Sequence, residues 1–207
     1  MQRQSRLYEI IVFLLILLFL IIPPFFTTRI MDADRIFNWA FPWKQAGLCA
    51  FALVLYFLSR KLNCQKKIFY PSLIALSLLF FIAIMIKLIC HQTPGSNKAI
   101  MPQGGMQVLF CLLTFAFSAV YEEIIYRFYF TDALKRLILI EWKYARIIFE
   151  AAGLAVFAFA HLYMGPASVI NAAFAHLVLR FLYKKTNLIW NCIIIHFIYN
   201  VISLILL

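Results

Sequence analysis

The amino-acid sequence predicts an all-α polytopic membrane protein with seven or eight membrane helices. Three observations support this fold class. Only 13% of the 207 residues are charged, against about 25% in an average soluble domain, and the mean hydropathy is +0.92. Apolar runs close to the roughly 20 residues that cross a hydrocarbon core as a helix recur along the chain. In the topology that these runs imply, the basic residues gather on one side of the membrane.

The first apolar run, Leu7 to Phe26, follows Arg3 and Arg6 and contains two prolines near its end. A secretory signal has similar features, but this run is long and no small-x-small cleavage site follows it, so an uncleaved anchor is favoured. Later runs predict helices from Trp43 to Ser59, Ile68 to Cys90, Gln107 to Phe130, Arg146 to Tyr163, Ala167 to Tyr183 and Leu188 to Leu207. We expect one membrane domain, residues 1–207, with N-terminal helices in 1–105 and a helical core in 106–207.

The net charge of +11 raises the question of a nucleic-acid partner. With the N-terminus in the cytoplasm, the cytoplasmic side receives fourteen basic residues, namely Arg3, Arg6, Arg60, Lys61, Lys66, Lys67, Arg127, Lys135, Arg136, Lys143, Arg146, Arg180, Lys184 and Lys185. The opposite side receives Arg29, Arg35, Lys44 and Lys98, and Lys87 lies within a span. This asymmetry is the positive-inside pattern. The charge therefore indicates topology and contact with anionic lipid headgroups, and no nucleic-acid partner is expected.

The five cysteines, at positions 49, 64, 90, 111 and 192, show no Cys-x-x-Cys pair and no zinc-finger spacing. Four lie in or beside predicted spans, where cysteine acts as a small apolar residue, and Cys64 falls on the reducing side of the membrane. We expect neither a disulfide nor a zinc-thiolate centre.

Polar side chains inside the apolar spans are the candidates for a functional site, because burying an ionisable group unpaired in lipid costs on the order of 3 kcal/mol or more. They are Lys87, Glu122, Glu123, Arg127, Glu150, His161, His176, Arg180, His196 and Asn200. Lys87 lies near a span end and can extend to the interface. Glu150 follows Arg146 by one helical turn, as an interfacial salt bridge would. Neither is assigned to the site.

The adjacent carboxylates Glu122 and Glu123 are expected to have different environments. Residues four apart share a helix face, so Glu123 should pair with Arg127, whereas Glu122 points about 100° away. Glu122 then lacks a counterion among apolar neighbours, and desolvation suits such a carboxyl for work as a general base. The structural alternative is a charge cluster that marks the cytoplasmic end of a helix.

Three further polar residues complete a possible reaction site. His196 and Asn200 are one turn apart on one face of the last predicted helix, where they can present donors to one oxygen. His161 follows a stretch rich in small residues that allow close helix packing. Each one alone also fits a polar contact between helices. Together with the glutamates they supply the parts of a water-activating hydrolase: a base, an orienting imidazole and an oxyanion-binding pair.

The motifs Glu122-Glu123-x-x-x-Arg127, Phe157-x-x-x-His161 and His196-x-x-x-Asn200 occur in this order in the C-terminal half. This pattern resembles the CPBP family of CAAX proteases and bacteriocin-processing enzymes, also called the Abi family. The resemblance covers about Leu109 to Ile202. Each motif is weak alone, but the three in order are specific.

The resemblance implies an intramembrane glutamate-dependent endopeptidase with its catalytic core in residues 106–207. Glu122 would activate the attacking water, His161 would assist, and His196 with Asn200 would hold the oxyanion. The Glu123–Arg127 pair would shape the site, so the candidate catalytic residues are Glu122, Glu123, Arg127, His161, His196 and Asn200. No cofactor is required. A divalent metal such as zinc is the mechanistic alternative, although no His-Glu-x-x-His motif is present.

The expected partners are the lipid bilayer and a peptide or protein substrate at the membrane. The expected location is the bacterial plasma membrane, with a cytoplasmic N-terminus. A noncatalytic immunity or regulatory scaffold on the same fold is one alternative. A proton-coupled transporter is another, since Glu and His within spans are typical of carriers, but no inverted repeat is evident.

Two features do not fit the resemblance easily. Where the family usually has Gly-x-x-x-Gly, this chain has His176 and Arg180, so the helices must pack more loosely there or these side chains must occupy a cavity. His176 is interpreted as a helix contact. Moreover, a helix ending near Phe130 places Glu122 only about 12 Å from the cytoplasmic end, whereas His161 would lie about 20 Å up the next helix. The two would meet only if residues 131–142 entered the protein as a short extra helix.

Overall fold

The structure, a computed structural model, describes residues 2–22, 39–59, 69–90, 101–138 and 144–206. Their regular elements are α1 (Gln2–Ile16), η1 (Leu17–Ile21), α3 (Trp43–Ser59), α4 (Phe69–Cys90), α5 (Gly105–Glu122), η3 (Glu123–Phe130), α6 (Thr131–Leu137), α7 (Ala145–Phe159), η4 (Leu162–Met164), α8 (Pro166–Thr186) and α9 (Ile189–Leu206). All of them are helical, and the predicted all-α membrane fold class is therefore confirmed.

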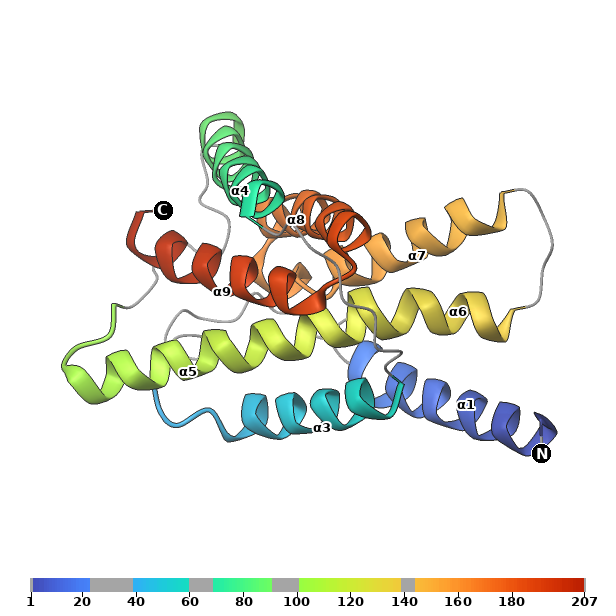
Figure 1. Cartoon of the computed structure of the whole chain (residues 1–207). Coiled ribbons are helices and arrows are strands. Elements are labelled where there is room, and N and C mark those ends of the chain that lie inside the picture. The colour runs from blue at the N-terminus through green and yellow to red at the C-terminus, as the bar shows by residue number, and fades with distance from the viewer. Residues whose placement is uncertain (1, 23–38, 60–68, 91–100, 139–143, 207) are drawn as a thin grey trace.

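One long helix runs through the middle of the molecule. α5, η3 and α6 follow one another without a break from Gly105 to Leu137, a total of 33 residues. Figure 1 shows α1 and α3 along one side of this helix and α7 and α9 along the other. α8 packs against α4, α7 and α9. The long helix therefore touches almost every other layer and can position side chains for all of them.

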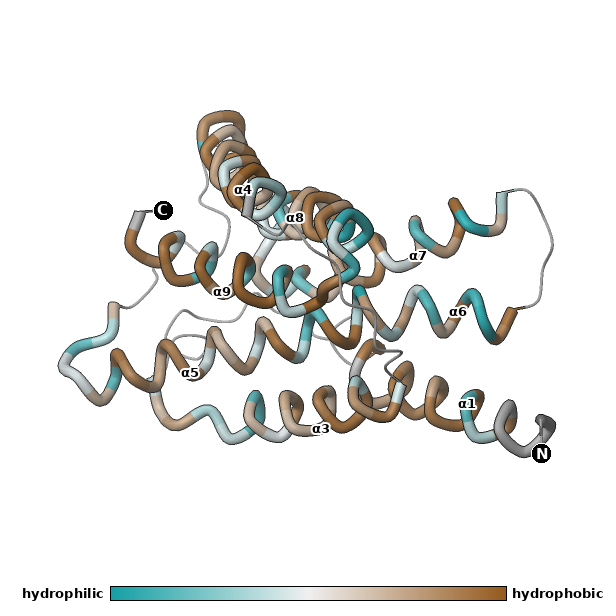
Figure 2. Tube along the Cα trace, in the orientation of Figure 1, coloured by the Kyte–Doolittle hydropathy of each residue, from teal (hydrophilic) through white to brown (hydrophobic). Residues whose placement is uncertain are grey.

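Among the residues that the structure describes, three helices are long and apolar enough to cross a membrane, judged by length and composition: Tyr70–Cys90, Gly105–Leu137 and Pro166–Thr186. The apolar helices Leu7–Phe19, Trp43–Ser59 and Ile189–Ile205 are shorter. Figure 2 shows that hydrophobic residues dominate α3, α4 and α9. The predicted number of seven or eight spans is not confirmed by these helix lengths.

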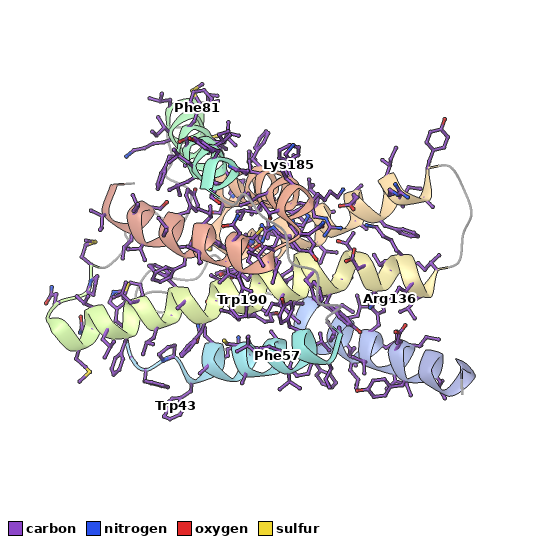
Figure 3. The ribbon with its side chains drawn as sticks, viewed as in Figure 1. Trp43, Phe57, Phe81, Arg136, Lys185 and Trp190 are labelled. Atoms are coloured by element: carbon purple, nitrogen blue, oxygen red, sulfur yellow. The ribbon has the colours of Figure 1, made fainter. Side chains whose placement is uncertain are left out.

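The outer surface is rich in large apolar side chains. Phe81 of α4 is 62% exposed and Trp43 of α3 is 77% exposed, and both lie on the outside of the bundle in Figure 3. Leu73, Ile74, Leu78, Leu88 and Ile89 add to the exposed face of α4. So much exposed apolar surface is unfavourable in water but is the expected surface of a protein in lipid.

The helix predicted to end at Phe130 continues to Leu137, and this corrects both sequence-based interpretations of residues 131–142. Residues 131–137 are neither a loop nor a separate extra helix; residues 139–143 lie outside the described part of the chain. Lys135 and Arg136 were counted on the cytoplasmic side, which suggested that the helix ends before them. In the structure Lys135 binds Glu150 at 2.8 Å and Arg136 faces Glu9 at 3.8 Å. Partners from two other helices therefore neutralise the charges that suggested a helix end.

Candidate active site

The two adjacent carboxylates lie where the long helix changes its winding. Glu122 is the last residue of α5, and Glu123 is the first residue of the π-helical segment η3. π-helical turns are rare and occur frequently at functional sites. The junction is close to the midpoint of the 33-residue helix, roughly 25 Å from the Gly105 end and roughly 23 Å from the Leu137 end. Ionisable groups at such a depth point to function.

Glu123 is fully buried and serves two partners. Its Oε1 atom forms an ion pair with Arg127, which is one turn further along the helix and has no exposed surface. The Nδ1 atom of His196 in α9 lies 2.6 Å from the same oxygen. The i,i+4 pairing of Glu123 with Arg127 that the sequence predicts is confirmed. The contact with His196, 73 residues away in sequence, gives the Glu123 carboxylate a second partner that can carry a positive charge.

Glu122 faces both predicted histidines. Its Oε2 atom lies 3.9 Å from Nε2 of His161 and 3.9 Å from Nε2 of His196. These separations are too long for direct hydrogen bonds. They suit a single water molecule held between the carboxylate and the two imidazoles. The structure thus brings together the three groups on which the sequence-based hypothesis depends.

Both imidazoles are oriented by their other nitrogen. Nδ1 of His161 lies 2.9 Å from the carbonyl oxygen of Phe157, which can only accept, so this nitrogen donates its proton there. Nδ1 of His196 donates in the same way to the Glu123 carboxylate. Each Nε2 atom is therefore left facing Glu122. A carbonyl or carboxylate behind the ring is a common way to fix the tautomer of a reactive histidine.

The position of His161 follows from the length of the hairpin formed by α6 and α7. α7 begins at Ala145 and runs back beside α6. His161 is 16 residues beyond Ala145, and Glu122 is 15 residues before Leu137, so both lie roughly 23 Å from the hairpin end. The apparent mismatch in depth disappears because the long helix extends past Phe130. α7 ends at Phe159, and the turn at η4 then holds His161 at the site.

Phe157 contacts both Arg127 and His161. The guanidinium carbon of Arg127 lies 4.6 Å from the centre of the Phe157 ring, a cation–π contact. The Phe157 ring also contacts the rings of His161, at 4.8 Å between ring centres, and Tyr126, at 5.4 Å. Phe157 is 2% exposed and therefore fixes Arg127 and His161 in relation to each other.

Asn200 lies one turn beyond His196 on α9 and is partly buried. The structure records no hydrogen bond of its side chain to another described residue. Its neighbour Tyr199 donates a hydrogen bond of 3.1 Å to Asn171 in α8, which holds this turn of α9 in place. The oxyanion-binding role of Asn200 stays a prediction.

Sequence reasoning missed a second ionic cluster beside the site. Arg180 binds Glu150 through Nε at 2.9 Å and through Nη2 at 3.0 Å, and it donates to the backbone carbonyl of Arg127. Lys135 and Lys184 also contact Glu150, at 2.8 and 3.1 Å. Glu150 was expected to pair with Arg146; it pairs with these three residues because its face of α7 lies against α6 and α8.

Two basic residues counted as cytoplasmic therefore have other positions. Arg127 lies inside the long helix and is fully buried, and Arg180 is only 6% exposed. The sequence did contain a signal for this pairing. Arg180 and the acidic Glu150 lie in neighbouring predicted spans, and each would be too costly to bury alone.

Glu122, His161 and His196 are chemically a possible donor set for zinc. Ligands of a tetrahedral zinc ion lie roughly 3.3 Å apart, as follows from bond lengths of about 2.0 Å, and the separations from the Glu122 oxygen are longer, at 3.9 Å. Within the described ranges no group of three or more His, Cys, Asp or Glu residues has the geometry of a metal centre.

Comparison with known proteins finds a matching family model. Residues 104–202 match the family model of type II CAAX prenyl endopeptidase Rce1-like proteins, and all six candidate residues fall within this range. No curated protein and no solved structure matches the chain significantly. The Rce1-like family consists of CAAX endopeptidases, which are peptide hydrolases. The match covers residues 104–202, just under half of the chain, and supports a CAAX-type intramembrane protease.

Proposed function

We propose that the protein hydrolyses a peptide bond of a membrane-associated peptide or protein with a water molecule activated by Glu122. The observation that supports this mechanism best is the position of the Glu122 Oε2 atom, 3.9 Å from the Nε2 atoms of both His161 and His196. A water molecule beside Glu122 and His161 has a carboxylate to accept its proton and an imidazole to orient it, which leaves His196 for the substrate carbonyl.

In the first step Glu122 accepts a proton from the water while the water oxygen attacks the carbonyl carbon of the substrate. His161, whose ring is held by the Phe157 carbonyl, orients this water. In the second step the C–N bond breaks, and Glu122 delivers the same proton to the leaving amine. The carboxylate is thus regenerated, and no further reactant is needed.

Between these steps negative charge develops on the substrate carbonyl oxygen. A protonated His196 donates to this oxyanion through Nε2, and Asn200 on the next turn of α9 adds its amide. The Glu123 carboxylate behind the ring stabilises the imidazolium. Arg127 holds the Glu123 carboxylate in place through their ion pair, so Glu123 and Arg127 are positioning residues.

The depth of Glu122, near the midpoint of the long helix, supports a substrate that reaches the site from the membrane. We further infer a bacterial plasma membrane with the N-terminus in the cytoplasm, and a secreted peptide, a leader or a membrane protein as the substrate class. The mechanism requires no cofactor.

The test uses the purified protein in lipid nanodiscs with a library of fluorogenic peptides. We expect Glu122→Gln, His161→Ala and His196→Ala each to lower kcat by about 100-fold or more, because each removes a group that handles a proton or charge in the transition state. Glu9→Gln is the matched control: Glu9 is a partly exposed carboxylate paired with Arg136, and its loss should leave kcat unchanged.

A chelator distinguishes the mechanisms. Wild-type activity that persists after chelation supports the glutamate-activated water. Activity that is lost with chelator and restored by zinc would replace it with a metal-bound water. If the three variants keep the cellular function of the wild type and no peptide is cleaved, the protein acts as a scaffold and the proposal fails.

A further inference from the structure

Arg180 of α8 contacts the long helix where its winding returns from π to α. The π-helical segment η3 ends at Phe130, and α6 begins at Thr131. Nη1 of Arg180 donates to the backbone carbonyl oxygen of Arg127 inside η3. Nη2 of Arg180 lies 3.4 Å from Oδ1 of Asp132, in the first turn of α6. The guanidinium therefore binds both sides of the junction.

A return from π to α winding leaves one backbone carbonyl without an amide partner. Each amide bonds the carbonyl four residues back in an α-helix and the carbonyl five residues back in a π-helix. Where the pairing shortens, two successive amides bond carbonyls that are two positions apart, and the carbonyl between them is skipped. With the return at Thr131, the skipped carbonyl lies about one turn earlier, at the position of Arg127. Arg180 thus supplies the donor that this winding requires, because a buried carbonyl without a donor is costly.

Glu150 of α7 fixes the direction in which Arg180 donates. Nε of Arg180 lies 2.9 Å from Oε2 of Glu150, and Nη2 lies 3.0 Å from Oε1, so the two side chains form a two-bond fork. The guanidinium carbon also lies 5.6 Å from the centre of the Tyr183 ring, on the same helix. A planar guanidinium that is held along one edge keeps its remaining nitrogen in a fixed direction. That nitrogen is Nη1, which meets the Arg127 carbonyl.

We propose that Arg180, oriented by Glu150, is a positioning residue that stabilises the π-helical winding of η3 and thereby sets the directions of Glu122 and Glu123. Its effect on the reaction rests on the proposed function. If η3 rewound as an α-helix, side chains before it would turn by about 100° relative to those after it, the angle of one residue. The contact of Glu123 with His196 would then be lost, and Glu122 would turn away from the imidazoles.

The winding is tested without any substrate. Arg180→Met removes the donors and keeps a long side chain, and Glu150 still has Lys135 at 2.8 Å and Lys184 at 3.1 Å, so its carboxylate is not left unpaired. An experimental structure of the wild type should show π winding over residues 123–130. The structure of Arg180→Met should show α winding there. An α-helical segment in the wild type, or unchanged π winding in Arg180→Met, would overturn the proposal.

The positioning role is tested by kinetics on the folded, monodisperse fraction of each variant. We expect Arg180→Met to lower kcat about 10-fold or more with little change in KM, because the reacting groups are displaced while the contacts with substrate remain. Arg180→Lys keeps a positive charge beside Glu150 but has no planar fork, so it should stay folded and also lose kcat. Full kcat in either variant would refute the positioning role.

Lys184→Met is the matched control, because it removes another cation from the same carboxylate and the same helix. Lys184 is 52% exposed, and kcat should stay nearly unchanged. Glu150→Gln should lower kcat in the wild type but not further in Arg180→Met, since Glu150 acts through Arg180. Additive losses would contradict this order of action. If the wild type cleaves no peptide, the proposed function fails, and the two structures still decide the winding.

Discussion

At Glu123 one buried carboxylate joins the long helix to α9, because it binds Arg127 on its own helix and His196 on the other. Removing one partner of a buried ion pair costs more than the pair contributes, since the remaining charge is left in a medium of low dielectric. Substitutions that remove one partner of this pair are therefore expected to lower the free energy of unfolding of the whole bundle.

We predict that Arg127→Met lowers the free energy of unfolding by about 3–5 kcal/mol, because it leaves the Glu123 carboxylate without its guanidinium. Unfolding of the purified protein in detergent micelles by denaturant measures this change. The double variant Glu123→Gln with Arg127→Met should recover most of the stability but not the peptidase activity. Wild-type stability of the single variant would contradict the expected cost of leaving the Glu123 carboxylate without Arg127.

At Gly153 the absence of a side chain allows the Thr131 hydroxyl to approach the backbone of α7. We predict that Gly153→Ala lowers the free energy of unfolding by about 1–3 kcal/mol, because the added methyl group overlaps Thr131 in a packed interior. Combining it with Thr131→Ala should relieve the overlap, so that the double variant is more stable than Gly153→Ala alone. Thermal unfolding in micelles checks both values, and strictly additive losses would contradict the contact.

At the scale of elements, Glu150 connects α6, α7 and α8. Its carboxylate binds Arg180 in a two-bond fork and also contacts Lys135 and Lys184. Arg180 in turn donates to the Arg127 carbonyl in the π-helical segment. The ionic cluster and the candidate active site therefore share a rigid connection through the backbone of the long helix.

We predict that Glu150→Gln lowers the free energy of unfolding by about 3 kcal/mol, because the largely buried Arg180 loses its counterion. Glu9→Gln is the comparison at an exposed pair, where both side chains are 46% exposed and a change within about 1 kcal/mol is expected. Denaturant titration of both variants gives the difference. Equal losses would mean that the cluster at Glu150 is as well solvated as the surface pair.

The elements differ in how far their sequence predicts them. α3 was predicted from Trp43 to Ser59, as observed, because apolar composition and helix length agree there. The Glu123–Arg127 pair followed from spacing along one helix. The end of the long helix could not be predicted in this way. Lys135 and Arg136 suggested an earlier end, but they are neutralised by Glu150 and Glu9, which come from other parts of the chain. Periodicity within one segment contains no information about partners supplied by another.

On the scale of the whole molecule, the basic ends of α6 and α8 lie on the same side of the bundle, since Lys135 and Lys184 share Glu150. The N-terminal end of α5 lies at the opposite end of the long helix (Figure 1). The positive-inside pattern predicts that the basic side faces the cytoplasm.

We predict that Met106→Cys reacts with a membrane-impermeant thiol reagent in intact cells, whereas Lys185→Cys reacts only after the cells are permeabilised. Met106 is 63% exposed at the start of α5, and Lys185 lies at the end of α8. The two variants are compared in a background without the native cysteines, which gives the baseline labelling. The reverse pattern would place the N-terminus outside.

The length of the helix from Gly105 to Leu137 has one more consequence. Its 33 residues extend roughly 50 Å, whereas a hydrocarbon core is about 30 Å thick. The helix must therefore tilt or project into the headgroup region, and its middle stays within the hydrocarbon core. A polypeptide at that depth normally hides its carbonyl groups in intrahelical hydrogen bonds. If the proposed cleavage takes place at that depth, the substrate must unwind locally first. We therefore expect polypeptides that unwind easily, because of glycine, proline or polar residues, to be the better substrates.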